Sequence, residues 1–347
     1  MKKAGASGRY VHLDALRGIL AIAVVIHHFS FATRLDWFNK AWISVDAFFI
    51  LSGFVIAHSY QGKLAAGMGL REFSVARLAR LYPLYFVGLL LGVLALLGSP
   101  FQPAPAPQEQ ATAIGFGLLV LPYLNGQLWP AIAGGAQGSV FPLNEPAWSL
   151  FYELFVNLVF FAWVRHGRML AAAAVALIFG IAHVLAAQHY GLHSGWAASN
   201  FAGGFIRVIF FFFLGVAIYA LHGRLALRSI WPFALGTAAL LVGFMFRSVA
   251  IDYLLLFLVA PLTILLGSRV RAGGARAAGL MSWLGSISYP IYIIHFPLGM
   301  MLHATALGEL AAPQFVLIST VVSLAAADLA ARGEKFARSH WRQRAPA

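Results

Sequence analysis

The sequence predicts an all-α integral membrane protein of about ten transmembrane helices with cytoplasmic N- and C-termini. Of its 347 residues, 61% are hydrophobic and 10% are charged, whereas a soluble domain is about 45–50% apolar and about 25% charged. This composition excludes a soluble globular enzyme, and the 29 Phe, 9 Trp and 11 Tyr exclude a disordered chain. Cysteine is absent, which excludes a cysteine nucleophile and a thiolate metal site.

The spans follow from apolar runs that are long enough to cross a bilayer. These runs cover roughly residues 13–33, 41–60, 81–98, 147–164, 169–188, 201–221, 230–247, 253–268, 284–303 and 314–332. A further run at 112–124 is shorter and contains Gly115, Gly117 and Pro122, so we do not expect it to span. The basic N-terminus leads into the first run without a small-residue cleavage site, which predicts a retained helix rather than a signal peptide.

The distribution of Lys and Arg orients these spans, because cytoplasmic loops carry the excess. Of the 24 basic residues, 19 fall in the alternate loops that share a side with the N-terminus and three fall in the opposite loops. The connection 99–146 contains no Lys or Arg, and we expect it to form an outer loop or a re-entrant lid. The predicted domains are therefore a transmembrane domain over 1–335 and a short basic cytoplasmic tail over 336–347.

Ionisable side chains within the spans are candidates for function, because each costs at least about 2.5–3.5 kcal/mol to insert. Helical spacing puts His28 about 16 Å outward from Arg17 on the same helix face. Asp46, Glu153 and His295 are expected at a depth similar to that of His28, in the outer half of the membrane. The sequence therefore predicts a group of acid–base residues near the outer face, with arginine nearer the cytoplasm.

This grouping is typical of proton transfer from a hydroxyl group. A neutral histidine that is oriented by a carboxylate removes such a proton, which makes His28 the candidate general base. Either Glu153 or Asp46 is the candidate orienting group, and pairing of these carboxylates with arginines such as Arg207 remains the structural alternative.

The arginines nearer the cytoplasm suit the phosphates of a donor, which they bind bidentately. Arg17, Arg77 and Arg80 are the candidates, although loops on the cytoplasmic side are also rich in arginine for topological reasons. A donor whose phosphates are bound by these arginines and whose reactive end reaches His28, about 16 Å away, must have a long arm between the two. Coenzyme A has that shape. No metal site is expected.

Five sequence blocks occur in a characteristic order. They are LDALRGILAIAVVIHHF, SVDAFFILSGFVIA, RLARLYPLY, EPAWSLFYELF and SYPIYIIHFPL. Together they resemble the membrane-bound acyltransferase 3 family over nearly the whole chain. The resemblance implies a multi-pass enzyme of the bacterial inner membrane that transfers an acyl group, usually acetyl, from cytoplasmic acyl-CoA to an acceptor hydroxyl at the outer face. It maps the essential histidine of the family to His28 and its essential arginine to Arg17.

The same resemblance implies a carbohydrate or glycolipid acceptor, such as O-antigen, exopolysaccharide or peptidoglycan. Tyr289, Tyr292 and His295 lie at intervals of three on one helix stripe and are candidates to donate a hydrogen bond to the oxyanion, as is a backbone amide. Trp148 and Arg207 are further candidates for contacts with substrate. Some family members carry a hydrolase-like C-terminal domain, so direct transfer and transfer through an acyl-enzyme or a partner protein remain alternatives.

A polytopic transporter or flippase is the competing class, because intramembrane His, Asp, Glu and Arg also form proton relays. Transporters often show repeated halves with matching broken helices, and the two halves of this sequence show no convincing repeat. Nucleic-acid binding is not expected, because the basic residues are spread over six cytoplasmic segments. The predicted partners are therefore acyl-CoA, the acceptor and the lipid bilayer.

Overall fold

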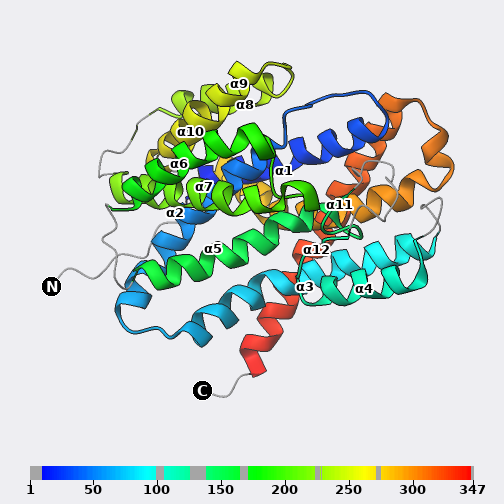
Figure 1. Cartoon of the computed structure of the whole chain (residues 1–347), viewed down its shortest axis with the longest axis horizontal. Helices are drawn as coiled ribbons and strands as arrows, with labels where there is room; N and C mark the ends of the chain where they lie inside the picture. Colours follow the sequence, from blue (N-terminus) through cyan, green and yellow to red (C-terminus); the bar gives the residue numbers. More distant parts are fainter. Residues whose placement is uncertain are drawn as a thin grey trace.

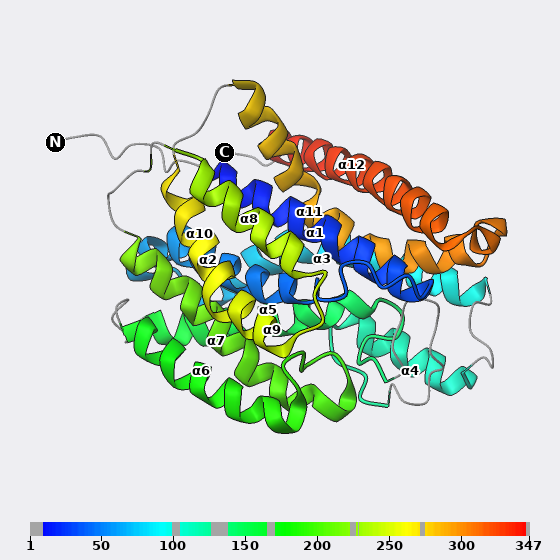
Figure 2. The same ribbon diagram turned by 90° about the horizontal axis from the view of Figure 1, so that it is seen from above.

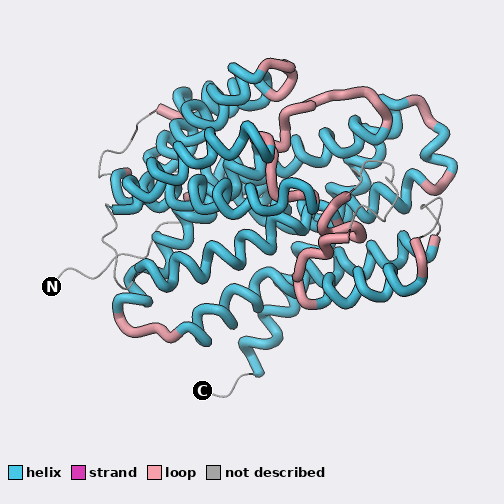
Figure 3. Tube along the Cα trace, viewed as in Figure 1, coloured by secondary structure: helices cyan, strands magenta, loops and turns pink. Residues whose placement is uncertain are grey.

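The computed structural model describes residues 10–98, 105–125, 138–164, 171–222, 227, 229–270 and 275–344. Over these ranges the chain is a bundle of helices without β-strands (Figures 1 and 3). The helices are α1 (Val11–Ala32), α2 (Ile43–Ala65), α3 (Leu70–Leu97), α4 (Pro107–Leu118), α5 (Trp148–Val164), α6 (Ala171–Tyr190), α7 (Phe201–Leu221), α8 (Trp231–Gly243), α9 (Val249–Leu254), α10 (Ala260–Arg269), α11 (Ala275–His303) and α12 (Ala312–Arg344). A short π-helical segment, Leu255–Val259, joins α9 to α10.

Nine helical segments in the described part of the chain are long and apolar enough to cross a membrane. They correspond to nine of the runs found in the sequence, so the prediction of an all-α polytopic membrane protein is confirmed. The remaining run forms α8, which has 13 residues and is about 20 Å long.

Helix α8 nevertheless joins the two ends of the bundle. At its start, the Leu227 amide donates to the Arg269 carbonyl at the end of α10, with an N–O distance of 2.8 Å. Beyond its other end, Lys40 of the α1–α2 connection pairs with Asp252 of α9 at 2.7 Å. The hairpin of α8 with α9–α10 therefore extends from one end of the bundle to the other, while the tenth crossing that the sequence predicts stays a prediction.

The start of α1 and the end of α12 point to the same end of the bundle (Figure 2). We call this end, to which the start of α11 also belongs, the basic end; the sequence predicts that it faces the cytoplasm. Helix α12 continues without a break through residue 336 to Arg344. The segment expected as a separate tail is thus an extension of the last helix as far as the described residues go.

The short helix α4 lies beside α3 in both views (Figures 1 and 2). The Tyr82 hydroxyl donates to the Leu118 carbonyl at 2.9 Å, and the Tyr85 hydroxyl donates to the Gly117 carbonyl at 2.5 Å. Because Tyr85 is about 18 Å along α3 from Leu97, the end of α4 reaches well into the length of α3. Carbonyls at a helix end need partners from outside the helix, and the Tyr85 hydroxyl adds a second bond to the Gly117 carbonyl, which also accepts from the Val120 amide.

Small residues let α2 and α7 approach closely. A Cβ atom on Gly53 would overlap the Phe212 carbonyl oxygen, and one on Gly215 would overlap the Ile50 carbonyl oxygen. Close approach through small residues is the main packing device between membrane helices. Each glycine therefore keeps one helix backbone against the other.

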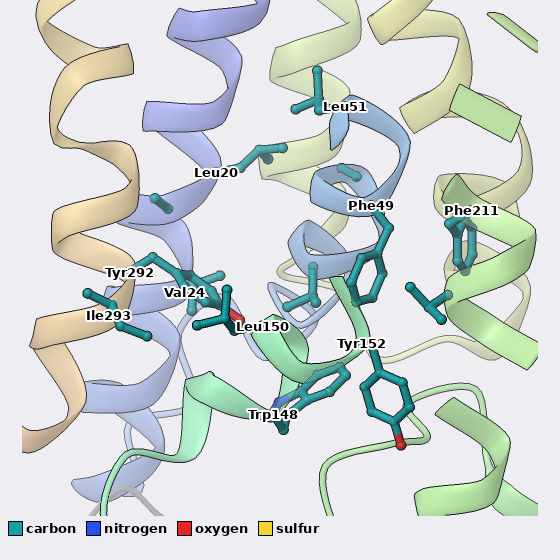
Figure 4. Close-up of a cluster of buried hydrophobic side chains, with 14 of the residues drawn as sticks. Leu20, Val24, Phe49, Leu51, Trp148, Leu150, Tyr152, Phe211, Tyr292 and Ile293 are labelled. Carbon is teal, nitrogen blue, oxygen red and sulfur yellow. The ribbon is translucent and has the colours of Figure 1, made fainter. Parts of the chain in front are cut away.

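The apolar core lies between α1, α2, α5, α7 and α11. Figure 4 shows Val24 and Tyr292 on one side of this core and Phe49, Trp148 and Phe211 across it, with Leu150 between them. All six side chains are buried. Because α1 and α11 pack along their lengths, residues that are far apart in the sequence meet here.

Candidate active site

A cavity of about 1350 Å³ extends inward from the basic end. Helices α1, α2, α3, α5, α11 and α12 contribute to its wall, and we call it the basic-end cavity. Its lining includes these residues that were singled out in the sequence: Arg17, Arg77, Arg80, Glu153, Tyr289 and Tyr292. The tertiary structure therefore brings six of the eleven candidates to one space.

Tyr292, Ser149 and Phe48 line the inner part of the basic-end cavity. The Tyr292 and Ser149 hydroxyl oxygens are 2.8 Å apart, and the Ser149 hydroxyl donates to the Pro146 carbonyl at 3.0 Å. The Phe48 ring packs edge-on against Tyr292 with a centroid separation of 5.5 Å. This polar contact between α5 and α11 belongs to the inner part of the cavity.

Two histidines lie directly behind this inner part of the cavity. The ring of His295 is 6.3 Å from the ring of Tyr292, and its Nε2 atom is 2.9 Å from Nδ1 of His28. His295 is fully buried. Helices α1 and α11 position the pair, because they pack against each other over their lengths.

The hydrogen bonds of His295 determine the tautomers of the pair. Its Nδ1 atom is 2.9 Å from the Ile291 carbonyl oxygen, and since a carbonyl only accepts, Nδ1 carries the proton. In a neutral ring Nε2 is then an acceptor, so His28 must donate from its own Nδ1. This leaves the Nε2 atom of a neutral His28 with a lone pair, as a general base requires.

The two candidate carboxylates bond to arginines instead of to His28. Asp46 accepts from Nε and Nη2 of Arg207 at 2.6 and 2.9 Å, and both side chains are buried. Glu153 accepts from Arg77 at 2.9 Å and from the Ser52 hydroxyl at 3.1 Å. Pairing with arginines, which the sequence left open as the alternative role of these carboxylates, is therefore the arrangement observed. In the described part of the chain, the hydrogen-bond partner of His28 is another histidine.

Arg207 and Trp148 belong to a buried cluster outside the cavity lining. The Arg207 guanidinium lies 5.7 Å from the centre of the Trp42 ring and 5.2 Å from that of Trp148, and it donates to the Ser194 carbonyl at 2.8 Å. The Asp46–Arg207 ion pair, together with the aromatic rings that face the guanidinium, therefore holds α2, α7 and the start of α5 together. The predicted role of Arg207 and Trp148 in contacting substrate stays a prediction.

His193 joins this cluster from the connection between α6 and α7. Its ring stacks on Trp42 at a centroid distance of 4.9 Å. Burial, followed by the nearby Arg207 guanidinium, lowers the pKa of His193 well below its ordinary value. The imidazole is therefore neutral at physiological pH.

Tyr289 is on the cavity wall, but its hydroxyl donates to the Leu81 carbonyl at 2.5 Å. The Tyr292 hydroxyl, beside Ser149, likewise donates to a carbonyl, that of Pro146, at 3.2 Å. Both tyrosine hydroxyls are therefore already bonded, and Tyr292 is the one next to the histidine pair. Arg17 is near the mouth of the cavity, with its Nη1 atom 3.5 Å from Asp14.

The structure adds residues that the sequence analysis missed. Ser52 and Ser149 bond to Glu153 and Tyr292, and both occur in the sequence blocks described above. Four more cavity residues come from the basic ends of α11 and α12: Trp283, Asp328, Arg332 and Lys335. Their only local sequence signal is the spacing of four between Asp328 and Arg332, which form an ion pair at 2.7 Å.

Comparison with known proteins identifies the family. A family model described as "Acyltransferase domain" matches residues 10–332. Protein 2 in picA locus of Rhizobium radiobacter is 35% identical over 202 residues, which cover 52% of this chain and 96% of that protein. Peptidoglycan O-acetyltransferase OatA of Listeria monocytogenes is 25% identical over 334 residues, covering 84% of this chain and 50% of that protein. The chain thus spans half the length of OatA, and no solved structure matches it.

Proposed function

This chain belongs to the acyltransferase family whose model matches residues 10–332, and from that premise we propose that it transfers an acetyl group from acetyl-CoA at the basic end to a hydroxyl at the opposite end. The observation that carries the proposal is the position of the basic-end cavity. Its mouth carries more basic than acidic side chains, and its inner part at Tyr292 is one ring away from the His28–His295 pair.

The charges at the cavity mouth support acyl-CoA as the donor. Arg17 of α1 and Arg80 of α3 line the cavity near the basic end, and guanidinium groups bind phosphates through paired hydrogen bonds. Arg77 is less suited to this role, because it is buried and bonded to Glu153. We therefore assign the donor diphosphate to Arg17 and Arg80, and the Arg77–Glu153 pair to the wall along which the pantetheine arm lies.

His28 is the proposed general base. Its Nε2 atom takes the proton from the acceptor hydroxyl as the hydroxyl oxygen attacks the thioester carbonyl carbon. The tetrahedral oxyanion then collapses, the carbon–sulfur bond breaks, and the leaving CoA thiolate takes the proton back from His28. His295 holds His28 in the required tautomer, and the Tyr292 hydroxyl is the proposed donor to the oxyanion, for which it must turn away from the Pro146 carbonyl that it bonds in this structure.

The acceptor is proposed to be a carbohydrate of the cell envelope, either a polysaccharide or a glycolipid. This rests on the name of the Listeria relative, a peptidoglycan O-acetyltransferase, and on a sugar hydroxyl being the kind of nucleophile that needs a general base. The corresponding location is the bacterial inner membrane, with the basic end in the cytoplasm.

Transfer of labelled acetyl from acetyl-CoA tests the function in membrane vesicles that contain the full chain. We expect His28→Ala to lower the transfer rate by about 100-fold or more, because it removes the base. His183→Gln is the matched control, since His183 is also buried in a span but contacts Phe210 and Phe211 rather than the cavity. Full transfer by the His28→Ala protein would overturn the proposed mechanism.

A further inference from the structure

The mouth of the basic-end cavity contains an aromatic side chain that is held in place by a carboxylate. The indole Nε1 of Trp283 on α11 donates to Oδ1 of Asp328 on α12 at 2.9 Å. The other oxygen of this carboxylate accepts from Nε of Arg332 at 2.7 Å. One carboxylate thus fixes both an aromatic ring and a guanidinium group at the cavity wall.

Trp283 keeps part of its surface accessible in this arrangement. It is 38% exposed and lines the cavity. Tryptophan at a membrane interface often serves as an anchor for the helix, but such a role does not require a carboxylate partner on a cavity wall. A partly exposed indole with its nitrogen already bonded offers its ring face to a planar ligand.

The basic groups at the mouth form two sets on different helices. Arg17 and Arg80 come from α1 and α3, whereas Arg332 and Lys335 come from α12, where their spacing of three places them on one helix face. The carboxylates of Asp14, Asp328 and Glu334 also line the mouth. Two separate basic sets suit a ligand with two separate anionic groups, and the second set is the one beside the indole.

We propose that Trp283, Arg332 and Lys335 form a subsite for the purine nucleotide end of the donor. The indole stacks on the purine base, and the two α12 cations bind the ribose 3′-phosphate, while Arg17 and Arg80 bind the diphosphate. This assignment rests on the proposed function, in which the donor is acyl-CoA. It makes the basic end of α12 a determinant of donor specificity.

Binding of three donors to the purified full chain tests the phosphate part of the subsite. The donors are acetyl-CoA, dephospho-acetyl-CoA, which lacks the ribose phosphate, and acetyl-phosphopantetheine, which lacks the nucleotide. We expect Lys335→Gln to weaken acetyl-CoA binding about 10-fold, because it removes a charged hydrogen bond, and to leave dephospho-acetyl-CoA unaffected. Lys63→Gln is the control, since Lys63 is exposed at the same end but is not in the cavity lining.

The same donors test the stacking part. Trp283→Leu should weaken both nucleotide-containing donors about 10-fold, as loss of a stacked base does, and leave acetyl-phosphopantetheine unchanged, whereas Trp283→Phe should retain most of the affinity. Trp231→Leu, at an exposed tryptophan outside the cavity lining, controls for general effects on the protein. A loss that is equal for all three donors, or no loss at all, would overturn the subsite. Failure of the unaltered protein to bind acetyl-CoA would instead overturn the proposed donor.

Discussion

His28 and His295 are 267 residues apart in the sequence, and their Nδ1 and Nε2 atoms are 2.9 Å apart in the structure. The hydrogen bond crosses from α1 to α11. Since His295 is itself held by the Ile291 carbonyl, the direction of the bond is determined, and it differs from the carboxylate–histidine arrangement expected from the sequence.

Substitution of His295 tests its role in positioning His28. We expect His295→Leu to lower kcat by about 10- to 1000-fold, because His28 is then free to adopt the wrong tautomer. The KM for acetyl-CoA should change little, since His295 is not in the cavity lining. His295→Gln should recover much of the rate, because its amide oxygen can accept the His28 proton. Equal rates for the Leu and Gln variants would contradict this role.

Variants of the Arg77–Glu153 pair test whether Arg77 neutralises Glu153 in the cavity wall or binds the donor phosphate directly. Arg77→Ala leaves the Glu153 carboxylate unpaired beside an anionic donor, and we expect the KM for acetyl-CoA to rise about 10-fold. In the double variant Arg77→Ala/Glu153→Ala, the KM should return at least halfway to that of the unaltered protein on a logarithmic scale. If Arg77 binds the donor phosphate directly, steady-state kinetics will show the double variant to be as impaired as the single one.

The Asp46–Arg207 pair is expected to contribute to stability. Asp46→Leu leaves a buried guanidinium unpaired and should lower the free energy of unfolding in detergent by about 3–5 kcal/mol. The combination Asp46→Leu/Arg207→Met should be more stable than Asp46→Leu alone, because neither charge remains. Arg332→Ala, at an arginine that is 76% exposed in its pair with Asp328, should change stability by less than about 1 kcal/mol. A similar loss for the buried and the exposed pair would refute this expectation.

Close packing of α2 on α7 predicts different effects for two glycines of α2. Gly53→Ala should destabilise the protein by about 1–3 kcal/mol, because the new methyl group overlaps the Phe212 carbonyl. Gly62→Ala should be neutral or stabilise it by up to about 1 kcal/mol, since nothing lies within 4 Å of the added Cβ. Melting temperatures of the two variants check this pair, and an equal shift for both would show that packing at Gly53 is not the cause.

Most of the fold was predictable from local sequence. An apolar run of about 20 residues has few alternatives to a membrane helix, and each of the ten runs corresponds to a helix or to the broken helix α9–α10. The short run at 112–124, which the sequence does not predict to span, overlaps the 12-residue helix α4. Helix α8 shows the limit of this approach. Its 13 residues are fewer than a membrane helix needs, and only the contacts at its two ends show how far it extends along the bundle.

The candidate site was predictable in part. The depth of Arg17, His28 and His295 along their helices follows from helical rise, and the structure places them in or directly behind one cavity. Glu153 was expected at the depth of Asp46, but it bonds to Ser52, which is six residues nearer the basic end of α2 than Asp46. The partners of these residues do not follow from helical rise. Rotation of a helix about its axis changes which neighbours its side chains contact but leaves the depth of every residue unchanged.

The sequence by itself thus determined that this protein is an α-helical membrane protein, since hydropathy and the loop charges act locally, and its ordered sequence blocks indicated the family. The tertiary structure alone decided that His28 pairs with a histidine, that Asp46 and Glu153 pair with arginines, and that the end of α12 reaches the cavity mouth. The physical reason is that these contacts join helices that are distant in the chain, and only their packing determines which faces meet.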